Sequence, residues 1–226
     1  MPRFGRPSVR IRAYFSSYHL WAAEHFAAKS LVIERAHCGQ MRFDIEHRAL
    51  VLAAVVEAGA FLEAVANELF VDCADDHASY TRPLPAQAVA ALRDRWRQWH
   101  TNGRSTVPTL EKFEAALECC AATPFDKSCA PHQDATSVIH LRNAVVHFTP
   151  EWVAADQRHK FECLKSRFAP NALMQGSGDA YFPNKCLGAG CAAWAATTVH
   201  TFADDFYARL SITPNYKSSL FSQRAQ

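Results

Sequence analysis

The residues best suited to chemistry lie in one short run in the second half of the chain. Arg142 and Asn143 are followed by His147, and His140 comes just before them. Imidazole takes or gives a proton near neutral pH, while a guanidinium stays charged and matches a phosphate with two parallel hydrogen bonds. The Asn143 amide can hold the ring or a phosphate oxygen. Such a set can supply the base, the acid and the positive charge that phosphodiester cleavage needs.

These residues are predicted to lie on a helix that ends near Pro150. At 100° per residue, one apolar stripe faces a core and a polar stripe faces roughly the opposite way. Arg142 lies on the flank between them, five residues before His147, so only the length of its side chain can bring the guanidinium towards the imidazole. The apolar stripe contains Val138, Leu141, Val145 and Phe148, and the polar stripe contains His140, Asn143 and His147.

The order Arg142-Asn143-x-x-x-His147 resembles the signature of the HEPN (higher eukaryotes and prokaryotes nucleotide-binding) domains, in which Arg and His are four to six residues apart. Two further segments resemble bacterial proteins of this type: Phe61–Phe70 (F-L-E-A-V-A-N-E-L-F) and Leu141–Trp152 (L-R-N-A-V-V-H-F-T-P-E-W). The resemblance covers about residues 17–152, and more loosely the last helix. It implies an all-α fold, a HEPN-like four-helix bundle with additional helices.

The resemblance also implies a function. Many HEPN proteins are metal-independent endoribonucleases of prokaryotic toxin–antitoxin or antiviral defence systems. Carried over to this chain, Arg142, His147 and Asn143 are the expected catalytic residues, RNA is the substrate, and a homodimer brings two motifs to one cleft. An antitoxin or a defence-complex protein is an expected partner. Some members carry a Tyr two residues after the His, where an antitoxin attaches nucleotides; Thr149 occupies that position here, so this mode of control is not carried over.

A second interpretation is a non-catalytic HEPN-like helical module. It would bind RNA or nucleotide, or serve as an interaction domain of a defence complex. An Arg and a His near a helix end can simply bond carbonyl groups and solvent. The two interpretations differ in whether the motif side chains line an accessible cleft or are used in internal hydrogen bonds.

A second long helix is predicted from Asp44 to Val71, apolar over most of its circumference and therefore central. Glu63 and Asn67 stand one turn apart on it and share a face. We expect them to orient Arg142 or His147; the alternative is an exposed edge or a hydrogen bond within the bundle. His140 is a third candidate for a supporting role, or a surface residue.

The remaining pattern predicts one domain, at residues 17–212, with an insertion at about 73–133, a basic arm at 1–16 and a tail at 213–226. Ser16 or Ser17 is a candidate cap for a helix that ends at Ala36, and Asp134 for the motif helix. Further helices are expected at Ala86–Trp99, Thr109–Ala121, Asp156–Phe168 and Ala189–Leu210, and strand-like alternation is absent.

The composition limits the classes of protein to which this chain can belong. Over 226 residues the net charge is +2, so no overall basic field marks nucleic-acid binding, although four arginines lie in the first twelve residues. The eight cysteines include the adjacent pair Cys119 and Cys120 and no C-x-x-C, which favours reduced thiols in a cytoplasmic protein. We expect no membrane span, no cofactor and no metal, since Cys186, Cys191 and His200 fit no zinc spacing.

Overall fold

The computed structural model describes residues 11–100, 107–150, 152 and 159–217, and this part of the chain is helical and contains no strand. The predicted all-α fold class is therefore confirmed. The long helices are α1 (Ser16–Ala36), α2 (Ile45–Ala74), α3 (Ala86–Trp99), α4 (Thr109–Cys119), α5 (His132–Val146) and α6 (Ala189–Leu210). Short helical turns follow at η1 (Lys160–Ser166), η2 (Ala172–Met174), η3 (Tyr181–Lys185) and η4 (Asn215–Lys217).

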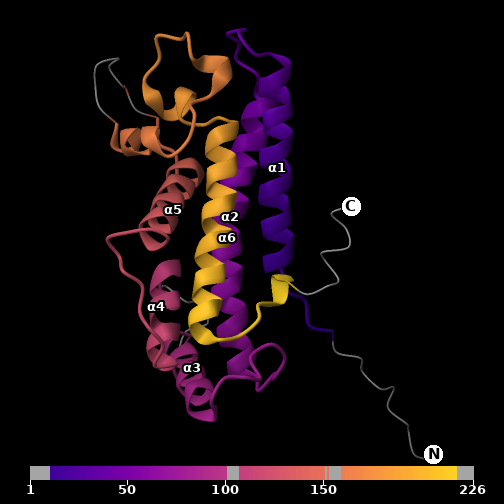
Figure 1. Cartoon of the computed structure of the whole chain (residues 1–226), viewed down its shortest axis with the longest axis vertical. Coiled ribbons are helices and arrows are strands. Elements are labelled where there is room, and N and C mark those ends of the chain that lie inside the picture. The colour runs from indigo at the N-terminus through magenta and orange to yellow at the C-terminus, as the bar shows by residue number, and fades with distance from the viewer. Residues whose placement is uncertain (1–10, 101–106, 151, 153–158, 218–226) are drawn as a thin grey trace, which may run out of the picture.

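α2 is the central element, as its apolar sequence predicts. It runs the length of the molecule and packs against both α1 and α6, which also contact each other, while α5, α4 and α3 lie along its other side (Figure 1). Phe61, Leu62 and Val65 are completely buried, and burial of each such side chain contributes about 1.5–3 kcal/mol. Asp44 begins the helix: its Oδ1 accepts a hydrogen bond from the His47 backbone N–H at 2.9 Å. α2 therefore forms the frame on which the motif helix rests.

The start of α1 differs from the prediction. Ser16 and Ser17 lie inside the first turn, and the carboxylate of Glu68 on α2 takes the role of the cap. It accepts hydrogen bonds from the backbone N–H groups of Phe15 and Ser16, each at 2.8 Å, and from Ser16 Oγ at 2.7 Å. Burial raises the pKa of Glu68 even though these bonds oppose it. The predicted serine cap is wrong because a buried carboxylate from another helix satisfies the free N–H groups.

The other helix boundaries agree more closely. α3 and α6 begin and end at the predicted residues, and α4 ends two residues early, at Cys119. The motif helix α5 begins at His132, so Asp134 lies in its first turn and is not the cap. Of the helix predicted at 156–168, residues 156–158 lie outside the described residues, and Lys160–Ser166 forms the 3₁₀ helix η1.

Both ends of the described chain bind the bundle. Arg12 Nε lies 2.6 Å from Asp72 Oδ1, and the Tyr14 hydroxyl donates to the other oxygen of Asp72 at 3.0 Å. Tyr216, in η4, is buried against Phe61 and donates to Asp204 at 2.8 Å. The other three N-terminal arginines and most of the predicted tail lie outside the described residues. Arg12, at least, is used in an internal ion pair.

α2 is long and apolar enough to cross a membrane by length and composition, but half of its most apolar stretch is buried within the protein. The same pattern is typical of the core helix of a bundle. All eight cysteines are free, and Cys73, Cys186 and Cys191 are buried.

Candidate functional site

The motif ends α5. His147 is the residue that closes the helix, and its backbone N–H donates to the Asn143 carbonyl at 2.9 Å. The chain leaves the helix here, so Phe148, expected on the apolar core stripe, is half exposed. The rest of that stripe packs as predicted, with Val138 and Leu141 completely buried.

The predicted polar stripe lines an open cavity of about 510 Å³. α5 contributes His140, Asn143 and His147, and η1 forms the facing wall. Both imidazoles are exposed, and neither makes a side-chain hydrogen bond or ion pair with another described residue. The stripe is thus a surface open to solvent and to ligands. Its other lining residues are Ser137, Ala144, Lys160, Phe161, Cys163 and Leu164.

Arg142 is placed differently from His147. Its stem lies against α2 at Gly59, where a Cβ would come within 2.8 Å of Arg142 Cγ. Its guanidinium turns back along α5, and Nη1 donates to Asn143 Oδ1 at 3.0 Å. Nε is buried and has no hydrogen-bond partner among the residues that the structure describes. Arg142 therefore does not line the cavity, and Asn143 is the residue that joins it to the wall containing His147.

Glu63 and Asn67 are not brought to Arg142 or His147. They share a face of α2, as predicted, but that face binds α4: the buried Lys112 ammonium donates to both side chains, and Thr109 also donates to Glu63. Burial raises the pKa of Glu63, but the hydrogen bonds from Lys112 and Thr109 outweigh it, and the net pKa is lower than usual. Because Lys112 needs a buried partner, this pair holds α4 onto α2.

Lys160 is the functional candidate that the sequence did not single out. It begins η1, and its Nζ lies 5.3 Å from the centre of the Phe161 ring at the cavity wall. Lys160 thus lines the same cavity as the polar stripe of α5. Only the tertiary packing of η1 beside α5 places it there, and no local pattern in the sequence signals that contact.

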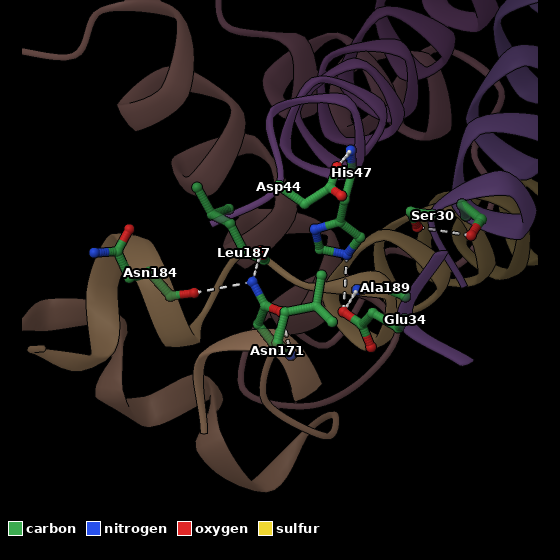
Figure 2. Close-up of polar contacts among 10 residues, drawn as sticks. Ser30, Glu34, Asp44, His47, Asn171, Asn184, Leu187 and Ala189 are labelled. Carbon is green, nitrogen blue, oxygen red and sulfur yellow. Dashed lines mark hydrogen bonds and ion pairs between the residues drawn. The ribbon is translucent and has the colours of Figure 1, made fainter. Parts of the chain in front are cut away.

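A buried polar cluster positions the segment that carries η1. Glu34 Oε1 accepts from the Ala189 backbone N–H at 2.8 Å and pairs with His47 Nε2 at 2.9 Å, which joins α1, α2 and the start of α6 (Figure 2). Next to it, Asn171 Nδ2 donates to the carbonyls of Asn184 and Leu187, at 3.2 and 3.1 Å. These bonds fix the η2–η3 segment, which contacts η1 above α5 (Figure 1).

Comparison with known proteins gives no match: no family model, no curated protein and no solved structure is similar to this chain. The HEPN assignment therefore stays a prediction that rests on the residues quoted above. What the structure adds is geometric: two imidazoles, an amide and an ammonium group meet at one accessible cavity.

The thiols considered as metal ligands are placed elsewhere. Cys186 and Cys191 are buried at the start of α6, while His200 lies near Glu24 and Asp204. Hydrogen bonding to Glu24 raises the pKa of His200 above its usual value. Among the described residues no group of three or more His, Cys, Asp or Glu side chains is arranged to hold a metal ion.

Proposed function

We propose that this chain is an endoribonuclease that cleaves single-stranded RNA at the cavity beside the end of α5. The observation that carries the proposal is that His140, Asn143 and His147 line one cavity together with Lys160. A cavity with two proton-transfer groups and a cation suits an RNA phosphodiester. The cation complements the negative phosphate, and an imidazole can take the proton of the neighbouring 2′-hydroxyl.

The roles follow from the chemistry. His147 removes the proton of the ribose 2′-hydroxyl, the 2′-oxygen attacks phosphorus, and the bond from phosphorus to the 5′-oxygen breaks. The products are a 2′,3′-cyclic phosphate and a 5′-hydroxyl that needs one proton. Lys160 and Arg142 stabilise the negative charge of the phosphorane. Asn143 holds Arg142 through the bond at 3.0 Å.

A second copy of the chain would complete the site. The departing 5′-oxygen needs an acid distinct from the base, and His147 of the partner subunit would supply it. Val146 and Phe148 flank His147 and are 45% and 50% exposed, so an apolar edge lies beside the motif. Burying that edge at a two-fold interface would stabilise a homodimer. Ile139, earlier on α5, is partly buried against the core and adds less to this edge.

Arg142 supports this function in a less direct way. A buried N–H without a partner costs about 1–3 kcal/mol, and Nε of Arg142 is such a group. Groups of this kind are retained where they serve a ligand or a reaction. We propose that the Nη groups of Arg142, which lie beside Asn143 and are exposed, contact a phosphate oxygen when RNA binds.

A setting in toxin–antitoxin or antiviral defence, in the cytoplasm and under the control of a bound partner, completes the proposal and rests on the family resemblance. Thr149 is exposed next to the site. Its hydroxyl replaces the modifiable Tyr of some HEPN proteins, so control by a bound protein suits this chain better than nucleotide attachment at that position.

The position of Arg142 favours one alternative. Because the stem of Arg142 lies against Gly59 and the residue does not line the cavity, the same surface also suits a module that binds RNA without cleaving it. In that case His147 and Lys160 contact phosphate, and no bond is broken.

The test is cleavage of a labelled single-stranded RNA by the purified protein in EDTA, with the product ends identified by mass spectrometry. We expect 2′,3′-cyclic phosphate ends, and a loss of about a hundredfold or more for His147→Ala, because general acid–base catalysis contributes that much. Arg142→Ala should be similarly impaired and Arg142→Lys little better. His140→Ala should be milder.

His25→Ala, on the outer face of α1, is the matched control and should cleave normally. Circular dichroism must show that each variant is folded. Full cleavage by a folded His147→Ala variant would remove the nuclease assignment from this site. RNA binding without cleavage by the wild-type protein would leave the binding module as the function.

A further inference from the structure

A second cavity, of about 430 Å³, opens between the start of α5, the end of η1 and α6. Two aromatic rings form part of its wall: Phe168 and Trp194, whose centroids are 5.2 Å apart at a tilt of 41°. Arg167 and Asp134 contribute opposite charges, and Thr197 and Thr201 contribute hydroxyl groups. None of these residues belongs to the proposed catalytic set.

The second cavity continues the first along the same two walls. On α5, Asp134 lines the second cavity and Ser137, one turn later, lines the first. On the facing wall, Leu164 of η1 lines the first cavity, and Arg167, the residue that follows η1, lines the second. From Asp134 to His147 the α5 wall spans about 20 Å at the rise of an α-helix. The two cavities therefore lie next to each other along α5, and together they are called the groove below.

The lining of the second cavity matches the parts of a nucleotide. The flat rings of Phe168 and Trp194 offer a surface for a base, because stacking on an aromatic side chain accepts any base. Arg167 Nη2 lies 3.2 Å from both Gln133 Oε1 and Asp134 Oδ1. A guanidinium has five N–H donors, so Arg167 keeps donors for a phosphate while Asp134 and Gln133 hold it in place.

We propose that this second cavity binds an unpaired base of the same single-stranded RNA, several nucleotides from the scissile bond, with Trp194 as the stacking platform and Arg167 as the contact to its phosphate. This inference rests on the proposed function, because it assigns the path of that substrate. The catalytic end of the groove has two imidazoles and Lys160, and the other end has aromatic rings. One end of the groove thus cleaves the RNA, and the other end favours RNA long enough to reach it.

The experiment compares the binding of a two-nucleotide and an eight-nucleotide oligouridine that carry 2′-O-methyl groups. These lack the attacking hydroxyl, so the assay reports binding without cleavage. We expect Trp194→Ala to weaken the longer probe about tenfold or more and to leave the shorter one unchanged. On cleavable RNA of eight nucleotides, KM should rise while kcat is retained. Trp194→Phe should restore binding, and Trp21→Ala, on the outer face of α1, is the matched control.

Arg167→Gln provides a test that does not disturb the aromatic packing. It should reduce the magnitude of the slope of log binding constant against log salt concentration by about one, the amount expected for the loss of one phosphate contact. Lys165→Gln, an exposed lysine of the same 3₁₀ helix that lines neither cavity, should leave the slope unchanged.

The outcomes separate the two proposals. If cleavage depends on His147 but Trp194→Ala binds the longer probe as tightly as the wild type, the groove proposal is overturned and the nuclease stands. If the longer probe depends on Trp194 but no RNA is cleaved, the groove stands and the nuclease falls. If neither probe binds, both fall.

Discussion

Two histidines in this chain have opposite surroundings. His47, at the start of α2, is 1% exposed, and its ring pairs with the Glu34 carboxylate. His147, at the end of α5, is exposed beside a cavity and makes no side-chain hydrogen bond with another described residue. Both lie at a helix end, so their position along a helix does not distinguish them. The first is used to join helices, and the second is available to a ligand.

The difference lies in whether the polar groups at each position have hydrogen-bond partners within the protein. In the buried cluster, the Ala189 backbone N–H and His47 Nε2 both bind the Glu34 carboxylate (Figure 2). Buried polar groups need such partners. At the motif, Arg142 Nε has none, and the imidazoles face solvent. Residues of the first kind determine stability, and we expect residues of the second kind to determine activity.

The largest effect on stability should come from Glu34→Ala. It would leave the Ala189 N–H and the His47 ring without their shared acceptor, in a site closed to water. We expect a loss of about 3 kcal/mol or more in the free energy of unfolding, measured by urea denaturation. Glu24→Ala, an exposed carboxylate of the same helix, is the matched control and should change stability by about 0.5 kcal/mol or less. Equal effects of the two would show that the buried cluster does not join the helices.

A crossed comparison of the two histidines tests the contrast itself. His47→Ala should lower the free energy of unfolding by about 2 kcal/mol, because it leaves a buried carboxylate short of one donor. His147→Ala should change it by about 0.5 kcal/mol or less, as surface substitutions usually do. RNA cleavage, corrected for the folded fraction, should show the reverse order. If His147→Ala is the more destabilising variant, the exposed imidazole has a structural role.

How far the sequence predicted this molecule depends on whether a feature is local. The ends of α3 and α6 and the apolar faces of α2 and α5 follow from periodicity and breakers within each segment. The polar stripe of His140, Asn143 and His147 lines a cavity because its spacing is helical. These features need only the short-range geometry of a helix.

Features that depend on a distant residue were missed. The cap of α1 comes from Glu68, 52 positions away from Ser16. Asn67 binds Lys112 instead of the motif because a buried ammonium on α4 competes for it. Lys160 reaches the cavity because the η2–η3 segment, fixed by Asn171, packs against η1. No periodicity within one segment carries this information.

Gly59 gives a prediction in which the sign of the effect changes. Alanine favours a helix interior over glycine by up to about 1 kcal/mol, but a Cβ here would lie 2.8 Å from Arg142 Cγ, and overpacking costs about 1–3 kcal/mol. We expect Gly59→Ala to destabilise the wild type by about 1 kcal/mol and to reduce cleavage by moving Arg142. In an Arg142→Ala background the contact with Cγ is removed and only Cβ of residue 142, at 3.3 Å, stays close. A small shift of the helices relieves that contact, so we expect the same change to stabilise.

The double-mutant cycle measures this coupling. Gly178, where a Cβ would meet nothing within 4 Å, is the control and should show no coupling to Arg142. If Gly59→Ala has the same effect on stability in both backgrounds, Arg142 does not depend on the close approach to α2.

The smallest effect concerns the cap that begins α2, next to His47. The backbone N–H of His47 lowers the pKa of Asp44 below its usual value of 3.8, although burial opposes this, and Arg42 adds to the lowering. A carboxylate with a lowered folded pKa contributes stability that is fully present above its unfolded pKa and is lost as pH falls through the folded one.

At neutral pH, Asp44→Ala should cost about 1 kcal/mol, while Asp44→Asn, which keeps the capping oxygen, should cost much less. As pH falls below 3.8, the charge-dependent advantage of the wild type over Asp44→Asn should disappear, and urea midpoints at each pH measure it. An advantage over Asp44→Asn that persists after the carboxylate is protonated would mean that the charge of Asp44 is not what stabilises the start of α2.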